Sequence, residues 1–317
     1  MTIYKKMKII FVAAAFFMFS ARVLSAAGGT TSATFLKLGV GARPVAMGSA
    51  FTGIADDVNA VSWNPAGLVN IEGKEFSFMH LEHFQNIKYE SVCYGVPLSV
   101  NSALAFGGGY LYTDDIAKTF INEDVYAGLV RDGSYRLEDK TFFVAYSRMF
   151  AEDKAAGLLI RWLSERIEDY EASGVSLDAG YLMLLSQNFS FGFSVQNLGG
   201  TIRFIAAEEK LPLTLRAGFG YNPYPSDGRL RFGVDVSKSS DYQPSVNVGV
   251  EYKIIKSVLD IRGGWRFKDL FSDDRLDDIS GLSCGIGFSF YRYTLDYAFV
   301  PYGALGYSHR ISLTGRF

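Results

Sequence analysis

The last eleven residues of the chain, 307–317, read YSHRISLTGRF. One set of alternate positions is mostly apolar and includes Ile311 and Leu313, whereas the other set is polar and includes Arg310 and Arg316. Successive side chains of a β-strand point to opposite faces. The stretch therefore predicts a strand with one apolar and one polar face.

The same alternation recurs from Glu75 to the end of the chain. We expect fourteen antiparallel strands, at 75–83, 88–97, 102–112, 140–150, 154–165, 174–185, 188–198, 212–221, 229–238, 244–254, 257–267, 280–290, 291–300 and 307–317. A tilted strand needs about 9–11 residues to cross a bilayer, which is close to these lengths. The sequence therefore predicts an all-β fold, a transmembrane antiparallel β-barrel of about fourteen strands.

The links between the expected strands support a membrane barrel. Links after even-numbered strands are short, except for 222–228, and several links after odd-numbered strands are long, such as 113–139 and 199–211. Bacterial outer-membrane barrels have short periplasmic turns and longer external loops. The chain also ends on an aromatic residue, Phe317, as such barrels usually do. A soluble β-protein with one wet face is the alternative, because alternation alone does not exclude it.

The N-terminus predicts export. Lys5, Lys6 and Lys8 precede the apolar run 9–19, and the small residues at 25–27 follow at cleavage spacing. This pattern is typical of a cleaved secretory signal peptide, with a single anchor helix as the alternative. We therefore expect a signal peptide at 1–27, an N-terminal hatch segment at 28–73 and a barrel at 74–317, located in the bacterial outer membrane.

Composition and motifs argue against several classes of function. The formal net charge is -2 and no basic tract suggests nucleic acid. The two cysteines, Cys93 and Cys284, form neither a disulfide framework nor a metal signature. Gly107-Gly108-Gly109 falls inside an expected strand, which favours close packing or a bend of the wall over a phosphate cradle. We expect no enzyme activity, no cofactor and no metal.

The polar faces of the strands predict a charged lumen. An outward Lys or Arg costs about 2–4 kcal/mol at the bilayer midplane, so we expect the strand charges to point inward. The lumen residues that this predicts are Arg216, Arg231, Asp235, Glu251, Asp260, Arg262, Arg292, Asp296 and Arg310. They indicate either a structural ladder of ion pairs or a basic path for anionic solutes.

Residues 28–73 lack a period of two and are rich in Ala and Gly. Asp56 and Asp57 are candidates to cap a short helix that runs to about Trp63, and Pro65 disfavours helical geometry at Asn64. The segment is too small and too apolar to stand alone. We therefore expect it to lie inside or across the mouth of the barrel.

Several motifs resemble those of a known family. The opening stretch 38–51 reads LGVGARPVAMGSAF, and it is followed by IADD at 54–57 and WNPAGL at 63–68. NLG at 197–199, LP at 211–212, DYAFVPYG at 296–303 and HRIS at 309–312 are similar as well. Together they resemble the PorV/PorQ family, and the Asn-Pro-Ala motif is similar to the wider group of FadL-like long-chain fatty-acid transporters.

The resemblance implies a fourteen-stranded barrel with a hatch, no enzyme activity, and a role in type IX-like protein secretion. The partners implied are secreted cargo or secretion-system proteins, beside outer-membrane lipid. The alternative is a FadL-like channel for hydrophobic small molecules such as long-chain fatty acids. For that alternative the candidate ligand-binding residues of the hatch are Phe51, Trp63, Asn64, Pro65 and Ala66.

Overall fold

The computed structural model describes residues 29–121, 129–204, 207–267 and 279–317. The predicted signal peptide, 1–27, lies outside these ranges. Within them, the helices are all too short or too polar to cross a membrane.

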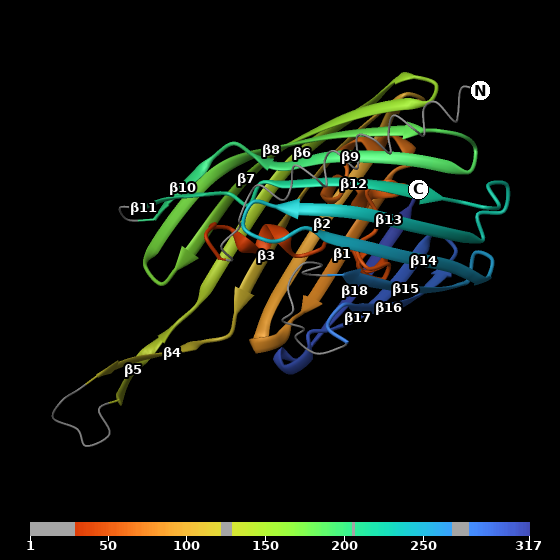
Figure 1. The fold of residues 1–317 in the computed structure, drawn as a ribbon. Coiled ribbons are helices and arrows are strands. Elements are labelled where there is room, and N and C mark those ends of the chain that lie inside the picture. Colours follow the sequence, from red (N-terminus) through yellow and green to blue (C-terminus); the bar gives the residue numbers. More distant parts are fainter. Residues whose placement is uncertain (1–28, 122–128, 205–206, 268–278) are drawn as a thin grey trace.

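Fourteen of the described strands close into one antiparallel barrel (Figure 1), which confirms the predicted fold class. Around the barrel they are β1 (Glu75–Glu82), β18 (Tyr307–Arg316), β17 (Tyr293–Pro301), β16 (Leu282–Phe290), β15 (Leu259–Phe267), β14 (Ser245–Ile255), β13 (Leu230–Ser239), β12 (Thr214–Tyr221), β9 (Phe189–Leu198), β8 (Tyr170–Leu184), β7 (Lys154–Ile167), β6 (Leu137–Ala151), β3 (Ser102–Thr113) and β2 (Ile87–Ser99). β1 pairs with β18, with Glu75 opposite Arg316, and this pairing closes the barrel.

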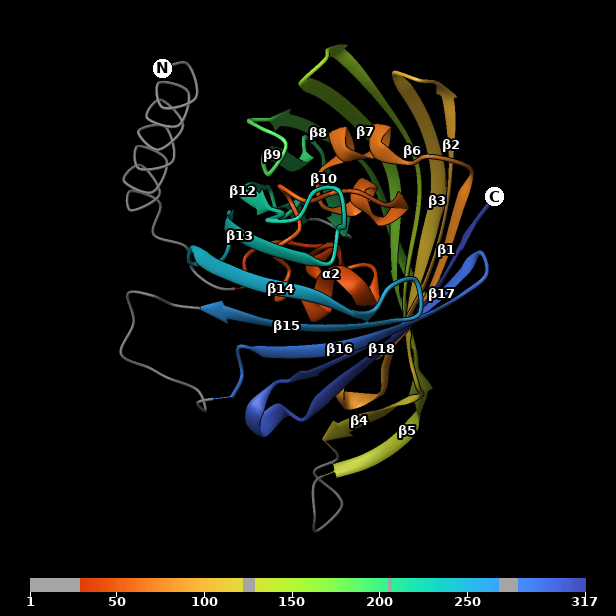
Figure 2. The ribbon, with the colours of Figure 1, turned by 90° about the vertical axis from the view of Figure 1, so that its right-hand side faces the viewer.

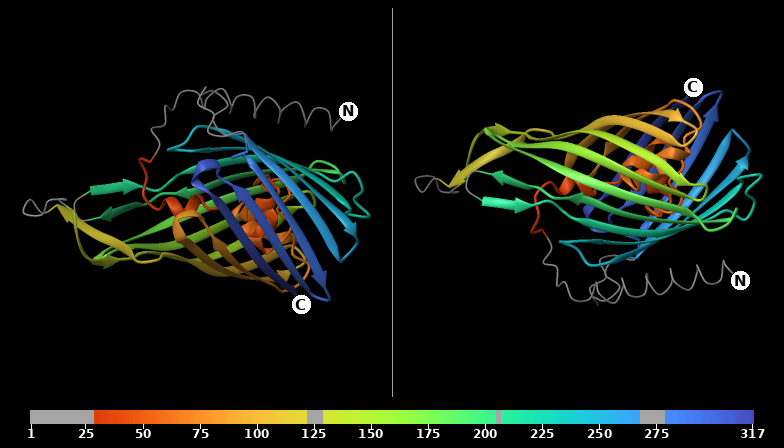
Figure 3. Two further views of the ribbon diagram at one scale, coloured as in Figure 1. Left: turned by 90° about the horizontal axis from the view of Figure 1, so that it is seen from below. Right: turned by 90° about the horizontal axis from the view of Figure 1, so that it is seen from above.

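Two short hairpins differ from the prediction. β4 (Ile116–Ile121) pairs with β5 (Leu129–Tyr135), and β10 (Thr201–Phe204) pairs with β11 (Ala207–Lys210), each as a separate two-stranded sheet. The alternation predicts plain links at 113–139 and 199–211 instead. Strands of four to seven residues are too short to span a bilayer, so their alternation did not separate them from loops. Figure 3 shows both hairpins at the same end of the barrel. We call this the loop end and the opposite end the turn end.

The strand faces follow the predicted alternation. On β16, Ile286, Phe288 and Phe290 are more than half exposed on the outer face, whereas Ser283 points inward and is buried. The exposed apolar side chains give the outer wall an apolar surface. The buried face looks into the barrel, where the N-terminal segment lies.

Residues 41–71, which we call the plug, fill the barrel interior (Figure 2). The short helices of the N-terminal segment are η2 (Thr34–Lys37), α2 (Ala42–Ala46), η3 (Val58–Ser62) and η4 (Pro65–Asn70), and η5 (Phe84–Asn86) and η6 (Gly303–Leu305) lie at the loop end. α2 lies against β15 to β18, and η4 lies against β6 to β8. As predicted, Asp57 caps η3 by accepting a hydrogen bond from the Asn59 amide, and Asn64 is extended before Pro65.

Inward glycines let the plug, mostly its backbone, approach the wall closely. A Cβ atom on any of them would lie within 3.0 Å of a plug atom. They come from different strands: Gly95, Gly157, Gly180, Gly192, Gly233, Gly249, Gly264 and Gly285. Because no side chain separates the two surfaces, the plug is held at many points around its circumference.

Candidate functional site

The guanidinium of Arg43 ties the plug to the wall. Its Nε donates to Glu251 Oε2 at 2.8 Å, and its Nη1 lies 2.6 Å from Asp56 Oδ1 and 2.7 Å from Asp57 Oδ2. Burial alone would lower the pKa of Arg43, but the three carboxylates raise it well above its ordinary value. Burial would raise the pKa of Asp56, yet Arg231 and Arg43 hold it below its usual range. Arg43 and Asp56 of the plug therefore stay ionised and paired.

Arg262 extends this cluster across the neighbouring strands. Its Nε donates to Glu251 at 2.7 Å, its Nη2 to Asp260 at 3.1 Å and its Nη1 to Asp296 at 2.6 Å. Arg231 also pairs with Glu251, at 3.2 Å. The structure thus brings five of the predicted lumen residues into one buried network, which has the form of the ion-pair ladder.

The other predicted lumen charges lie apart from this network. Asp235 accepts hydrogen bonds from the backbone amides of Phe51 and Thr52, at 3.0 and 2.8 Å. The Arg216 guanidinium stacks on the Trp63 ring at 5.0 Å. Arg310 is almost fully buried and donates to Ser308.

Arg292 does not point into the lumen as predicted. It is exposed in the two-residue turn between β16 and β17, because β17 starts at Tyr293 and not at Tyr291. Tyr291 adopts a positive φ of 59°, which ends the period-two alternation in this turn.

The predicted hatch residues hold the plug in place. The rings of Phe51 and Trp63 meet edge to face at 6.5 Å. Asn64 Nδ2 donates to the carbonyls of Thr52 and of Tyr181 on β8, both at 3.0 Å.

Pro65 begins η4, and the Ala66 carbonyl accepts a hydrogen bond from Ser147 of β6. None of the five predicted ligand residues is among the described residues that line the cavity below. Their role in ligand binding therefore stays a prediction.

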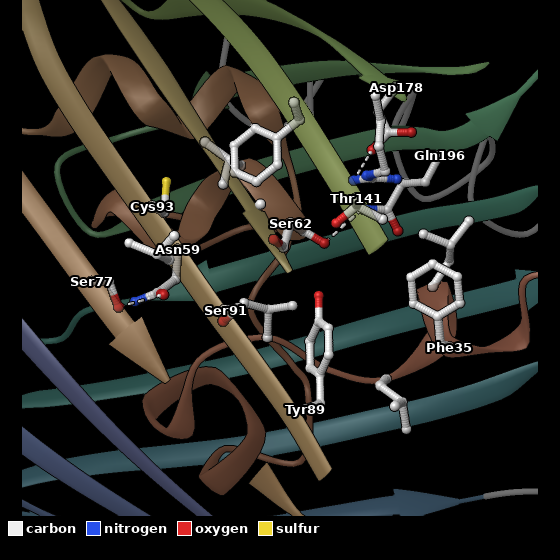
Figure 4. A pocket seen from close by; sticks show the side chains of 18 of the residues that line it. Phe35, Asn59, Ser62, Ser77, Tyr89, Ser91, Cys93, Thr141, Asp178 and Gln196 are labelled. Carbon is white, nitrogen blue, oxygen red and sulfur yellow. Dashed lines mark hydrogen bonds and ion pairs between the residues drawn. The ribbon is translucent and has the colours of Figure 1, made fainter. Parts of the chain in front are cut away.

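A small chamber of about 40 Å³ lies between the plug, the wall and residues 31–40, which we call the strap (Figure 4). Its lining includes apolar side chains of the strap (Phe35, Leu36, Leu38 and Val40) and, from the wall, Tyr89, Cys93 and Phe143. Its polar lining comprises Asn59, Ser62, Ser77, Ser91, Thr141, Arg161, Asp178, Gln196 and Asn197. Figure 4 shows Phe35 and Tyr89 on one side, with Asp178, Gln196 and Thr141 across from them. The chamber thus has a polar side around Asp178, Gln196 and Thr141.

The polar side is rigidly bonded. Arg161 donates to Asn197 Oδ1 at 2.8 Å and to Asp178 Oδ2 at 3.0 Å. Asn197 holds a positive φ of 58° at an irregularity in the pairing of β8 with β9. Gln196 donates to the Ser62 carbonyl of the plug at 2.8 Å. These groups satisfy one another's hydrogen-bonding capacity, so their side chains are held in place on the polar side of the chamber.

A groove of about 800 Å³ lies on the outer face of the wall, over β1, β2, β3 and β6. The apolar side chains of its lining are Phe78, Val92, Phe106, Tyr110, Phe142 and Phe143. Glu90, Glu138 and Lys140 are its charged residues, and they belong to the half of the strands nearer the loop end. The groove is therefore amphipathic along the strand direction.

The groove and the chamber meet across Gly107-Gly108-Gly109 of β3. They share the lining residues Ser91, Val92, Gly108, Thr141 and Phe143. The strand pairing is continuous here, with Gly108 opposite Val92 on one side and Phe142 on the other. The wall is closed, but three successive residues contribute no side chain to it. These glycines, for which close packing or a bend of the wall was predicted, thus lie between the chamber and the groove.

Most of the residues that line the chamber carry no signal in the sequence. Tyr89, Phe143 and Arg161 lie at ordinary inward positions of their strands, so nothing in the alternation distinguishes them from wall filling. The one available signal was the glycine triplet, which is unusual inside a strand.

No protein-family profile and no curated protein matches the sequence. The toluene transporter TodX of Pseudomonas putida is similar in structure, with a TM-score of 0.62 and 13% identity over 87% of this chain and 96% of its own. The CymD monoaromatic hydrocarbon channel gives a TM-score of 0.60 and 12% identity over 88% and 98%.

A FadL homologue of Pseudomonas aeruginosa gives a TM-score of 0.50 and 12% identity over 86% and 96% of the two chains. At these identities the likeness shows the fold alone: this chain shares the barrel fold of these three proteins. The finer resemblance to the PorV/PorQ family stays a prediction.

Proposed function

We propose that this protein is a non-enzymatic outer-membrane channel for small hydrophobic solutes, which leave the barrel sideways through the wall at β2, β3 and β6. The observation that carries the proposal is the contact between chamber and groove at Gly107-Gly108-Gly109, where five residues line both. Fold likeness to TodX and CymD supports a hydrophobic cargo.

The plug makes a sideways route shorter than a straight one. A path along the barrel axis would have to displace the Arg43 network and the contacts between the plug backbone and the wall glycines. A path through the wall needs only a local opening beside Gly108. Hydrophobic solutes also gain free energy by leaving directly into lipid instead of crossing water.

The outer surface supports an outer-membrane location. β16 and β6 each present a row of exposed apolar side chains, such as Ile286 and Phe288, and Phe142 and Val144. Such a surface is unfavourable in water and favourable in lipid. We assign the turn end to the periplasm and the loop end to the outside, because short turns face the periplasm in such barrels.

Uptake by liposomes that contain the purified protein tests the proposal. Val92→Trp fills the groove from an outer position that is 54% exposed, and Val234→Trp makes the same change on β13, where the side chain is 45% exposed. We expect the first variant to slow the uptake of radiolabelled toluene and oleate several-fold and the second to leave it unchanged. Equal uptake by both variants would exclude the route at β3.

Protein secretion is the second candidate, and one feature favours it. The β4–β5 hairpin projects from the loop end (Figure 3), where a cargo protein has access to it. Deleting residues 116–135 should abolish co-purification of secreted proteins with the barrel but leave solute uptake intact. If wild-type protein retains no secreted protein, this second function is ruled out.

A further inference from the structure

The strap lies across the loop end of the barrel and is attached there to β11 and to the link between β13 and β14, both far from it in sequence. The Ser32 amide donates to the Lys210 carbonyl of β11 at 3.2 Å. Thr31 Oγ1 and Lys37 Nζ both donate to Asp241 Oδ2, at 2.7 and 2.5 Å. The Lys37 ammonium also lies 4.5 Å from the centre of the Tyr242 ring. Asp241 and Tyr242 belong to the link between β13 and β14 at the loop end.

Asp241 is the centre of this attachment. Its carboxylate is fully buried and accepts a third hydrogen bond from Ser239 Oγ at 2.8 Å. Charge-assisted hydrogen bonds of this kind are roughly twice as strong as neutral ones. We call the contact of Asp241 with Thr31 and Lys37 the latch.

The inner side of the strap fills the space beneath it. Phe35 is 5% exposed and belongs to one apolar cluster with Tyr89, Leu111, Leu163 and Ile202. Leu36, Leu38 and Val40 pack against the same cluster. The strap therefore places its apolar side chains where the chamber would otherwise be open.

The remaining volume is too small for an organic solute. The chamber holds about 40 Å³, whereas pockets for small organic ligands are roughly 300–1,000 Å³. Room for a solute thus requires the strap to leave. The backbone provides a pivot between strap and plug at Gly41, whose φ of 88° is accessible to glycine at little cost.

We infer that the strap is a built-in competitor: its apolar side chains occupy the solute site of the chamber, and the latch at Asp241 sets how often that site is free. This inference rests on the proposed channel function and adds a site and its regulation. The site is lined by Tyr89, Leu111, Phe143, Leu163 and Ile202 and takes an apolar solute. A solute and the strap exclude each other, so weakening the latch raises the apparent affinity for the solute.

Cys93 provides a direct readout of the strap, because it is buried and lines the chamber. The full-length chain carries Cys284→Ser, which removes the other, exposed cysteine. A small charged methanethiosulfonate is then added from the aqueous phase to protein in detergent. We expect Asp241→Asn to raise the rate of Cys93 labelling about tenfold, the effect of losing one charge-assisted hydrogen bond.

Asp115→Asn is the matched control, because Asp115 pairs with Arg136 at 2.6 Å at the loop end and makes no contact with the strap. It should leave the labelling rate unchanged. Lys37→Met is the second variant, in case Asp241→Asn does not fold, and should also speed labelling. Unchanged labelling in both latch variants would overturn the strap as a lid.

Binding of N-phenyl-1-naphthylamine, an apolar fluorescent probe, separates the two proposals. We expect Asp241→Asn to lower the dissociation constant of the probe several-fold, and Phe35→Ala to do the same. Faster labelling with no gain in probe affinity would overturn the competitor role. Slower uptake by Val92→Trp with unchanged probe affinity would support both the sideways route and the competitor role of the strap. Normal uptake by that variant would overturn the sideways route but not the competitor role.

Discussion

Arg43 of the plug and Glu251 of β14 lie 208 residues apart in sequence and share two hydrogen bonds, Nε to Oε2 at 2.8 Å and Nη2 to Oε1 at 3.0 Å. The pair is buried, and Asp57 and Arg262 extend it on either side. Removing one partner of a buried ion pair leaves an uncompensated charge. The contact is therefore the strongest single candidate for what holds the plug in the barrel.

Replacing Glu251 should weaken the fold. We expect Glu251→Gln to lower the free energy of unfolding by about 3 kcal/mol, the usual loss when a buried pair is broken. Urea unfolding in detergent micelles measures it. Glu138→Gln is the control, because Glu138 pairs with Lys140 on the outer face at 3.3 Å. This change should lower the free energy of unfolding by less than about 1 kcal/mol. Equal effects of the two changes would contradict the special role of the Arg43 network.

Neighbouring glycines of β15 test the direct contact of plug and wall. A Cβ on Gly264 would lie 2.0 Å from the Gly48 amide nitrogen, whereas a Cβ on Gly263 would meet nothing within 4 Å. We expect Gly264→Ala to destabilise the protein by about 2 kcal/mol through overpacking, and Gly263→Ala to be neutral. Thermal unfolding of the two variants decides this. A tolerated Gly264→Ala would mean that the plug can move away from the wall.

These contacts also show how far the sequence predicts the structure. Alternation places Glu251, Asp260 and Arg262 on the inner face, because the direction of a strand side chain depends only on its parity. It does not reveal that Arg43, on a segment without alternation, reaches Glu251. That contact depends on the path of the plug through the interior, which no local pattern encodes.

The errors have equally local causes. Arg292 has the parity of an inward residue, but the turn at Tyr291 interrupts the strand before it. Trp63 and Asn64 stand out in sequence, and their side chains donate hydrogen bonds to the carbonyls of Val40 and Tyr181, but their role in ligand binding stays a prediction. The strap residues Phe35 and Leu36 gave no signal, because a short apolar stretch before a glycine-rich turn resembles many others.

The latch should respond to acid in a defined window. Burial would raise the pKa of Asp241, but its bonds with Lys37, Thr31 and Ser239 hold that pKa below its ordinary value. A carboxyl group with a lowered pKa stabilises the closed strap above the ordinary carboxyl pKa of about 4 and loses this contribution as the pH falls through its own lower value. Wild-type protein should therefore behave like Asp241→Asn only below about pH 4.

Labelling of Cys93 with 4,4′-dithiodipyridine, which reacts with thiols in acid, follows this change. The ratio of the Asp241→Asn rate to the wild-type rate should stay constant from pH 7 to pH 5 and begin to fall towards one only below about pH 4. A ratio that already falls between pH 7 and pH 5 would assign the titration to another group.

Phe143 should control the rate of sideways passage. It points inward from β6, lines both the chamber and the groove, and lies opposite Gly107, where a Cβ would be 2.8 Å from its ring. Its ring therefore lies beside the glycines of β3, which contribute no side chain to the wall, and partly fills the space there. We expect Phe143→Ala to raise the rate of toluene uptake by liposomes several-fold and to lower the free energy of unfolding by about 2 kcal/mol, since the side chain is only partly buried.

Leu159→Ala on β7 is the matched control, because Leu159 belongs to the same apolar cluster but does not line the chamber or the groove. It should lose comparable stability without faster uptake. If both variants speed uptake equally, the gain comes from a loosened barrel and not from an opening at Gly107.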